Sequence, residues 1–73
     1  MNRKIPKGLE ILDKEPVEIA NPYSGEKVTL QPDAVAVYDY IKGSEALQEY
    51  KGVREGLDWF RKHEPDAYML LLD

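Results

Sequence analysis

Apolar and polar residues alternate with a period of two in the first half of the chain. The alternation places Val17 and Ile19 on one side of an extended segment. It resumes with Val28 and Leu30 after a polar interruption, N-P-Y-S-G at Asn21–Gly25. In that interruption proline presets φ and glycine tolerates a positive φ. Two alternating segments joined by such a turn predict a β-hairpin.

The period changes to 3.6 residues after Gln31. Pro32 suits the first position of a helix, and Asp33 complements the positive helix end. The apolar residues that follow are spaced i, i+3, i+4 and i+7, which predicts an amphipathic helix. This stripe consists of Ala34, Val37, Tyr38 and Ile41. Val35 and Tyr40 lie off the stripe, so we expect the helix to contact neighbours on two sides.

Glycines in the middle of the chain set the expected helix ends. Gly43 is a candidate C-cap, and a second short helix would then run over residues 45–51. The alternative is one continuous helix with Gly43 inside it, at a cost of about 1 kcal/mol relative to alanine. Gly52 is expected to end either helix.

The last third of the chain contains two more helical patterns. Residues 53–63 carry Val53, Leu57 and Phe60 on one stripe, with cations in the last turn, where the helix dipole favours them. Pro65 ends this helix, because the residue before a proline disfavours the helical conformation. Residues 66–72 predict a final helix of about two turns, which persists only if it is packed.

Residues 1–16 contain no long element. Residues 9–15, bounded by Gly8 and Pro16, are too short for an independent helix and predict a short strand or a single turn. Met1–Lys7 is basic, and Pro6 and Gly8 disfavour a regular element. We therefore expect an extended, flexible arm before a single domain at residues 17–73. The arm is expected to be solvated. The alternative is a basic arm that grips a nucleic acid or an acidic partner.

These patterns predict a small single-domain α+β fold, in which an N-terminal β-hairpin packs against three or four short helices. The expected core collects the inward positions of the hairpin and the apolar stripes of the helices. It comprises Ile19, Val28, Leu30, Val37, Tyr38, Ile41, Leu47, Leu57, Phe60 and Leu71.

The composition supports a folded core and narrows the classes of function. Of 73 residues, 42% are hydrophobic and 33% are charged, as in globular proteins. The chain has no cysteine and one histidine, so neither a disulfide nor a structural zinc site is expected. The net charge of -4 argues against a protein that wraps a nucleic acid backbone. No membrane span or signal-peptide pattern is visible, so we expect a cytoplasmic protein without a membrane partner.

Two short segments contain residue types that carry chemistry. W-F-R-K-H at residues 59–63 combines aromatics and cations as single-stranded nucleic acid sites do. Phe60, however, belongs to the core stripe, and the cations suit a helix end. H-E-P-D at residues 63–66 supplies an imidazole and two carboxylates without the spacing of a metal or acid/base motif. We therefore expect no catalytic residues, metal site or cofactor, and a protein that is not an enzyme.

The apolar run at residues 68–72 predicts contact with another molecule. Burial stabilises each large side chain of Met69–Leu72 by roughly 1.5–3 kcal/mol, and such a short helix leaves one apolar face for a partner. Tyr23, in the hairpin turn, has little core to reach and is expected to be exposed. Leu70 or Leu71 is expected at a homo-oligomeric or heteromeric interface. The predicted partner-binding residues are Tyr23, Trp59, Tyr68, Leu70 and Leu71.

Three segments carry a resemblance to known proteins. They are N-P-Y-S-G at residues 21–25, Q-P-D-A-V-A-V-Y-D-Y-I-K-G at residues 31–43 and L-D-W-F-R-K-H-E-P-D-A-Y-M-L-L-L-D at residues 57–73. Together they resemble small, mostly uncharacterised proteins encoded by tailed bacteriophages. The resemblance implies a protein of the infected bacterial cytoplasm that binds and redirects a host protein, or a minor part of the virion. It implies no catalytic residues.

The sequence thus predicts a non-enzymatic protein-binding module, a phage-encoded modulator or inhibitor of a host protein. Its partner would be a host or phage protein. One alternative is a structural or assembly protein that acts through self-association as a homo-oligomer. The other is a nucleic-acid-binding accessory protein.

Overall fold

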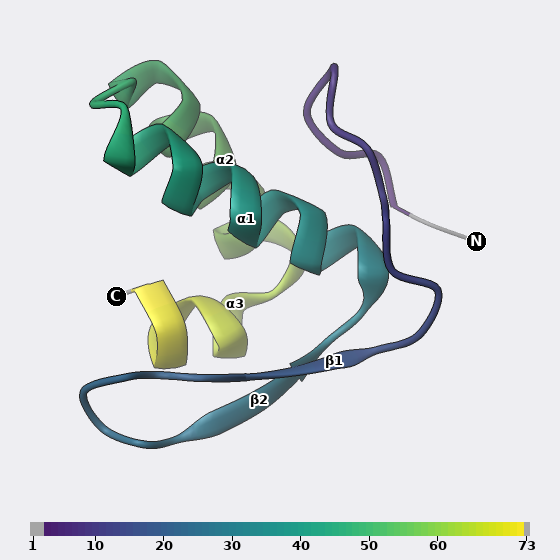
Figure 1. The fold of residues 1–73 in the computed structure, drawn as a ribbon, viewed down its shortest axis with the longest axis vertical. Coiled ribbons are helices and arrows are strands. Elements are labelled where there is room, and N and C mark those ends of the chain that lie inside the picture. Colours follow the sequence, from purple (N-terminus) through teal and green to yellow (C-terminus); the bar gives the residue numbers. More distant parts are fainter. Residues whose placement is uncertain (1–2, 73) are drawn as a thin grey trace.

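A two-stranded hairpin and two long helices form the framework of the computed structural model, which describes residues 3–72 (Figure 1). The hairpin runs along the lower side of the view in Figure 1, and the helices lie above it. The predicted α+β class, an N-terminal hairpin followed by helices in one small domain, is confirmed. In chain order the elements are β1 (Val17–Ala20), β2 (Lys27–Leu30), α1 (Pro32–Ala46), α2 (Tyr50–His63), α3 (Pro65–Ala67) and the π-helix η1 (Tyr68–Leu72).

The antiparallel hairpin pairs its strands in a register that gathers the apolar residues on one face. Val17 lies opposite Leu30, and Ile19 lies opposite Val28. Directly opposed residues of an antiparallel pair share one face of the sheet. Leu30 is fully buried at 0% exposure, and the other three side chains are half-buried and pack against the core. The alternation in the sequence therefore predicted both the strands and their inward face.

Helix α1 begins at the predicted residue and extends beyond the predicted end. Gln31 is the N-cap, with extended backbone, and Pro32 occupies the first turn. The helix then passes through Gly43 to Ala46. The expected end at Gly43 is therefore wrong. The alternative is right that Gly43 lies inside a helix, but it is wrong in continuing that helix to Gly52, because α1 ends at Ala46 and α2 begins at Tyr50.

Backbone hydrogen bonds define the end of α1. Gln48 has a positive φ of 56°. Its N–H donates to the carbonyl of Glu45 at 3.0 Å, and the N–H of Glu49 donates to the carbonyl of Ser44 at 2.8 Å. These two bonds form a Schellman motif, in which a left-handed residue reverses the chain. Glycine usually fills that position, so a glutamine gave no signal of the turn.

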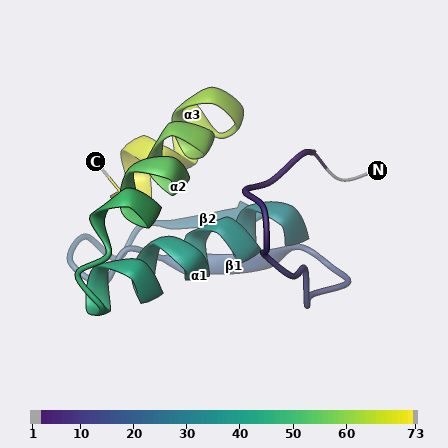
Figure 2. The same ribbon diagram turned by 90° about the horizontal axis from the view of Figure 1, so that it is seen from above.

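Two glycines allow α2 to approach α1 closely. Gly52 lies inside α2, so the expectation that it ends a helix is wrong. Gly56 follows one turn later on the same face. A Cβ atom on Gly52 would lie less than 3.0 Å from Ser44 Oγ, and one on Gly56 less than 3.0 Å from Ile41 Cγ1. The two helices therefore lie close together at positions that have room for hydrogen but not for a methyl group. Figure 2 shows the two helices side by side.

Most of the predicted core is correct. Leu30, Val37, Ile41, Phe60 and Leu71 are buried, and the remaining residues except one pack partly buried against them. The exception is Leu47, which is 82% exposed. The prediction fails there because Leu47 caps α1 immediately before the chain reverses at Gln48.

Four buried hydrophobic residues were not in the predicted core: Ala34, Val35, Trp59 and Ala67. Val35 is 5% exposed although it lies off the apolar stripe of α1. Its burial confirms that α1 contacts neighbours on two sides. Trp59 is 7% exposed and meets the ring of Phe60 edge-on, with the centroids 5.4 Å apart.

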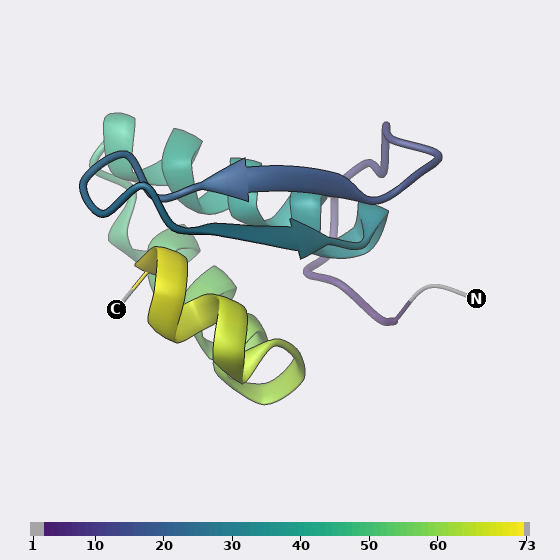
Figure 3. The same cartoon turned by 90° about the horizontal axis from the view of Figure 1, so that it is seen from below.

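The apolar run at the end of the chain forms α3 and η1. These lie beside the hairpin and against α2 (Figures 1 and 3). Ala67 and Leu71 face the core, whereas Met69 is 68% exposed. Within residues 3–72, no helix has both the length and the apolar character needed to cross a membrane.

The segment before β1 contains no helix or strand over residues 3–16, yet its first described residue is bound to the helices. The guanidinium of Arg3 donates from Nε to Asp33 Oδ2 and from Nη2 to Asp33 Oδ1, both at 3.0 Å. Its Nη1 donates to Glu64 Oε2 at 2.6 Å. Arg3 of the basic arm therefore pairs with carboxylates of its own chain, at the start of α1 and the end of α2.

The ion pair between Arg3 and Asp33 predicts a pH dependence of stability. Hydrogen bonds from the Arg3 side chain hold the pKa of the Asp33 carboxyl below its ordinary value of 3.8, against the opposing effect of burial. Because the folded-state pKa lies below the unfolded-state pKa, this stabilisation is complete above the unfolded pKa of about 4. It is lost as the pH falls through the folded pKa.

We expect the free energy of unfolding of wild type to exceed that of Asp33→Asn by a constant amount between about pH 5 and pH 8. The difference should shrink below about pH 4, where the Asp33 carboxylate becomes protonated in the unfolded chain while it still carries its charge in the folded protein. Urea titrations of both proteins at closely spaced pH values measure it. A difference that does not change down to about pH 2 would contradict the assignment.

Candidate functional site

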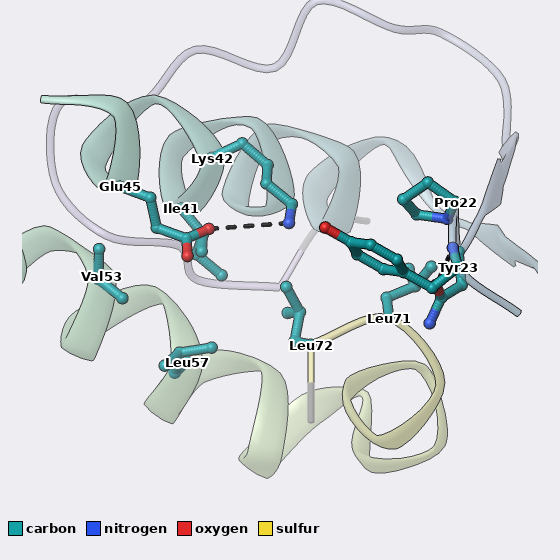
Figure 4. Close-up of a pocket in the computed structure, with 10 residues that line it drawn as sticks. Pro22, Tyr23, Ile41, Lys42, Glu45, Val53, Leu57, Leu71 and Leu72 are labelled. Carbon is teal, nitrogen blue, oxygen red and sulfur yellow. Dashed lines mark hydrogen bonds and ion pairs between the residues drawn. The ribbon is translucent and has the colours of Figure 1, made fainter.

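A pocket of about 200 Å³ opens where the hairpin loop, α1, α2 and η1 meet (Figure 4). Its inner wall is apolar and comprises Ile41, Val53, Leu57, Leu71 and Leu72. Its rim comprises Asn21, Pro22, Tyr23, Lys42 and Glu45. Four elements that are distant in the sequence therefore contribute to one apolar concavity with a polar edge.

Asn21 shapes the hairpin loop that forms one side of the pocket. Its Oδ1 accepts hydrogen bonds from the N–H groups of Tyr23 at 2.8 Å and Ser24 at 3.3 Å. Its backbone carbonyl accepts from the N–H of Gly25, which has a positive φ of 78°. Side-chain acceptance of this kind is the mechanism by which asparagine stabilises turns.

The same asparagine joins the loop to the last helical segment. Asn21 Nδ2 donates to the backbone carbonyl of Leu70 at 2.8 Å. A helix close to its end has carbonyls without an intrahelical partner, and a side-chain amide can satisfy one of them. This bond holds η1 beside the loop, and residues of both segments line the pocket.

Tyr23 is the most exposed aromatic side chain at the rim. It is 97% exposed and, in Figure 4, points from the hairpin loop toward Lys42 of α1. Lys42 Nζ lies 3.7 Å from Glu45 Oε1, and both side chains are about half exposed. Exposed ion pairs contribute about 0–1 kcal/mol to stability, so either charge can be redirected toward a bound molecule at little cost.

The five predicted partner-binding residues differ in how far the structure exposes them. Tyr23 is exposed as predicted, and Tyr68 and Leu70 are half-buried. Trp59 and Leu71 are buried in the core, at 7% and 9% exposure. Tyr23 and Leu71 both line the pocket, Tyr23 at its rim and Leu71 on its inner wall, whereas Trp59 does not line it.

Trp59 instead lines a second hollow, which the N-terminal segment forms against α2. This hollow has a volume of about 420 Å³ and is shallower and more open than the pocket. The indole Nε1 donates to the backbone carbonyl of Lys4 at 2.7 Å. Buried tryptophan normally satisfies its N–H in this way, so the contact explains how Trp59 packs without involving a partner.

Two residues of the H-E-P-D segment, His63 and Glu64, make contacts at the end of α2. Glu64 accepts from Arg3, and the ring of His63 lies 4.8 Å from the ring of Trp59. Asp66 is exposed in the first turn of α3. In the part of the chain that the structure describes, no three His, Cys, Asp or Glu side chains lie close enough together to hold a metal ion.

The sequence reasoning missed several residues that form the pocket. Pro22, Lys42 and Glu45 belong to its rim, and Val53 and Leu72 to its wall. Val53 and Leu72 were visible as apolar positions, but the partner-contact prediction did not include them. The positions of Lys42 and Glu45 gave only the i, i+3 spacing of a surface ion pair, which occurs on many helices.

Comparisons with protein-family models, with curated proteins and with solved structures each gave no significant match. The functional inference therefore depends on the geometry of the pocket and on the chemistry of its lining residues.

Proposed function

We propose that the protein is a non-enzymatic protein-binding module that captures an apolar side chain of another protein in the pocket beneath Tyr23. The observation that carries the proposal is the combination of an apolar inner wall with a fully exposed tyrosine at the rim. Tyrosine at the edge of a desolvated pocket is a frequent hot spot of protein interfaces.

The size of the pocket favours a side chain over a small-molecule ligand. Sites for drug-sized ligands occupy about 300–1,000 Å³. A volume of about 200 Å³ is below that range. A stable protein interface, by contrast, needs one or two filled pockets within a larger contact area. Tyr23 and the Lys42–Glu45 pair extend the contact area beyond the pocket itself.

Burial of one large apolar side chain in the pocket would contribute roughly 1.5–3 kcal/mol to binding. The half-exposed Lys42 and Glu45 offer one charge of each sign beside it. Such charges affect association rate and register more than affinity. The expected partner therefore presents an apolar anchor flanked by polar residues.

The resemblance of the C-terminal segments to tailed-bacteriophage proteins makes a host protein of the infected bacterium the first partner to test. In this proposal the protein modulates or inhibits that host protein by occupying part of its surface. The aromatic rings of W-F-R-K-H do not support the nucleic-acid alternative, since Trp59 and Phe60 are 7% and 0% exposed and offer no free face to a base.

The test is affinity capture from bacterial lysate, followed by titration of the captured protein. We expect Tyr23→Ala to weaken binding roughly 10- to 30-fold, corresponding to a hot-spot loss of about 1.4–2 kcal/mol. Leu72→Asp, which places a charge in the pocket wall, should weaken it at least as much.

Leu12→Ala is the matched control, because Leu12 is also a large exposed apolar residue, at 77%, but does not line the pocket. It should bind as wild type does. Equal affinity of wild type, Tyr23→Ala and Leu72→Asp for the captured protein would contradict the assignment of the pocket. Capture of no stoichiometric partner would contradict the proposed host-binding function.

A further inference from the structure

The contacts of Arg3 form a complete binding site for an arginine side chain, built from Asp33, Trp59, His63 and Glu64. Besides its bonds to the two carboxylates, the guanidinium donates from Nη1 to the carbonyl of His63 at 2.9 Å. Its Cζ lies 5.0 Å from the centroid of the Trp59 ring. Paired carboxylate oxygens, a carbonyl and an aromatic face are the groups that a planar guanidinium recognises.

This arginine site depends on being filled. The side chain of Asp33 is 3% exposed, so its carboxylate is shielded from water when Arg3 is in place. Without Arg3 this carboxylate would keep the hydrogen bond from the N–H of Ala34 at 2.7 Å but would lack a counter-charge, and a buried carboxylate without a counter-charge is disfavoured. The backbone N–H of Arg3 also donates to Asp33 Oδ2 at 3.0 Å. The site therefore selects an arginine together with the start of an extended segment.

The connection between the arginine site and the hairpin is loosely built. Residues 6–16 contain no helix or strand, and Leu12 within them is 77% exposed. Gly8 has a positive φ of 92°, and the N–H of Leu9 donates to the carbonyl of Pro6 over a long 3.4 Å. Leu9 packs against the core and would move together with Arg3. The path of the chain can change at little cost after Leu9, since only Ile11 is partly buried over residues 10–16.

We infer that the arginine site also accepts Arg3 from a second copy of this chain, by reciprocal exchange of the N-terminal segments. The exchanged segment makes the same contacts in the second copy, so the exchange costs only the association of the two chains. A short flexible tether gives the chain's own Arg3 an effective concentration in the millimolar range. The closed monomer therefore predominates in dilute solution, and exchange becomes favourable as the protein is concentrated.

Two complementary variants test this directly. Arg3→Ala keeps Asp33 but lacks the guanidinium, and Asp33→Asn keeps Arg3 but lacks the buried charge. When they are mixed, Arg3 of the second variant can fill the intact site of the first. The N-terminal segment of the Arg3→Ala chain then occupies the site of the Asp33→Asn chain. That site has no carboxylate at position 33, so no Asp33 carboxylate in the mixed dimer lacks a guanidinium. One variant is labelled with ¹⁵N, and dimers are counted by native mass spectrometry.

We expect mixed dimers to exceed either homodimer by at least about tenfold, because only the mixed species restores the charge-assisted pair between Arg3 and Asp33. The unfolding midpoint of the mixture should also rise above that of Arg3→Ala alone. The control replaces Asp33→Asn with the double variant R3A/D33N, which supplies no arginine and should give no excess of mixed dimers. If circular dichroism shows that Arg3→Ala is unfolded, Arg3→Lys takes its place, because lysine lacks the planar fork.

A mixture that remains monomeric up to about 1 mM, the scale of the tethered concentration, would overturn the inference. So would an equal excess of mixed dimers with the double variant. Neither outcome involves the pocket beneath Tyr23, so the proposed function and the exchange of segments can fail independently.

Discussion

Replacing Gly56 with alanine is expected to lower the free energy of unfolding by about 3 kcal/mol, the upper end of the usual cost of overpacking a core. The added methyl group would overlap Cγ1 of Ile41, which is 1% exposed. Either α2 moves away from α1 or Ile41 leaves its rotamer. Urea denaturation followed by circular dichroism measures the loss.

Gly43→Ala is the matched control, because it makes the same substitution within a helix. A Cβ on Gly43 would contact nothing within 4 Å, and the residue is exposed in α1. Alanine at a position of this kind stabilises by about 0.5–1 kcal/mol. If the two substitutions changed stability in the same direction, the close crossing of α1 and α2 would be contradicted.

A double-mutant cycle identifies the contact itself. Ile41→Ala alone should cost about 2–5 kcal/mol, because it leaves a cavity in the core. Once the Ile41 side chain is shortened, adding Gly56→Ala should cost little, since the overlapping atoms are gone. A strongly favourable coupling energy is therefore expected, whereas additive effects would place the strain elsewhere.

Arg3→Ala is expected to lower the free energy of unfolding by about 1.5–3 kcal/mol, the range for hydrogen bonds to charged groups. Asp33 Oδ1 would keep the hydrogen bond from the N–H of Ala34 at 2.7 Å. The variant leaves the Asp33 carboxylate, 3% exposed, without its guanidinium. It also removes the cation from the face of Trp59, so the tryptophan fluorescence should change in the folded state. Denaturation at pH 7 and emission spectra provide the two measurements.

Lys7→Ala removes the same charge from the same segment at an exposed position. Surface substitutions of this kind usually change stability by less than about 0.5 kcal/mol. Equal stability of Arg3→Ala and Lys7→Ala would show that net charge, and not the contacts of Arg3, accounts for the effect.

The local elements of the fold were predictable because their signals are local. The alternation of Val17, Ile19, Val28 and Leu30 depends only on the strand period, and it predicted both the hairpin and its inward face. The start of α1 followed from Pro32 in the same way. The helix ends were less predictable. The turn at Gln48 uses a left-handed glutamine, and Gly43 and Gly52 lie inside helices, where glycine is normally disfavoured.

The glycines in α2 illustrate why the helix ends were less predictable. Gly52 and Gly56 are four residues apart, a spacing that places both on one helix face. Their function depends on Ser44 and Ile41 of the neighbouring helix, and nothing in the local sequence states which helix will lie there. The four-residue spacing of Gly52 and Gly56 indicates that another helix could approach closely. The interpretation of Gly52 as the end of a helix overlooked this signal.

The candidate site was predictable only in its separate parts. An exposed Tyr23 followed from its position in a turn, and an apolar C-terminal run was evident. That these face each other across a pocket depends on the bond from Asn21 to the carbonyl of Leu70, which joins residues 49 positions apart. Such a contact leaves no periodic pattern in the sequence.

The sequence by itself determined the composition of the fold: a hairpin, helices with apolar stripes, and a C-terminal run that must be buried. These follow from the 2.0 and 3.6 residue periods and from the cost of leaving large apolar side chains in water. The tertiary structure alone decided which faces meet. It placed Arg3 against Asp33 and Glu64, brought α2 against α1 at two glycines, and assembled the pocket from four elements. Those pairings depend on the packing of the whole chain, because each residue's partner is distant in the sequence.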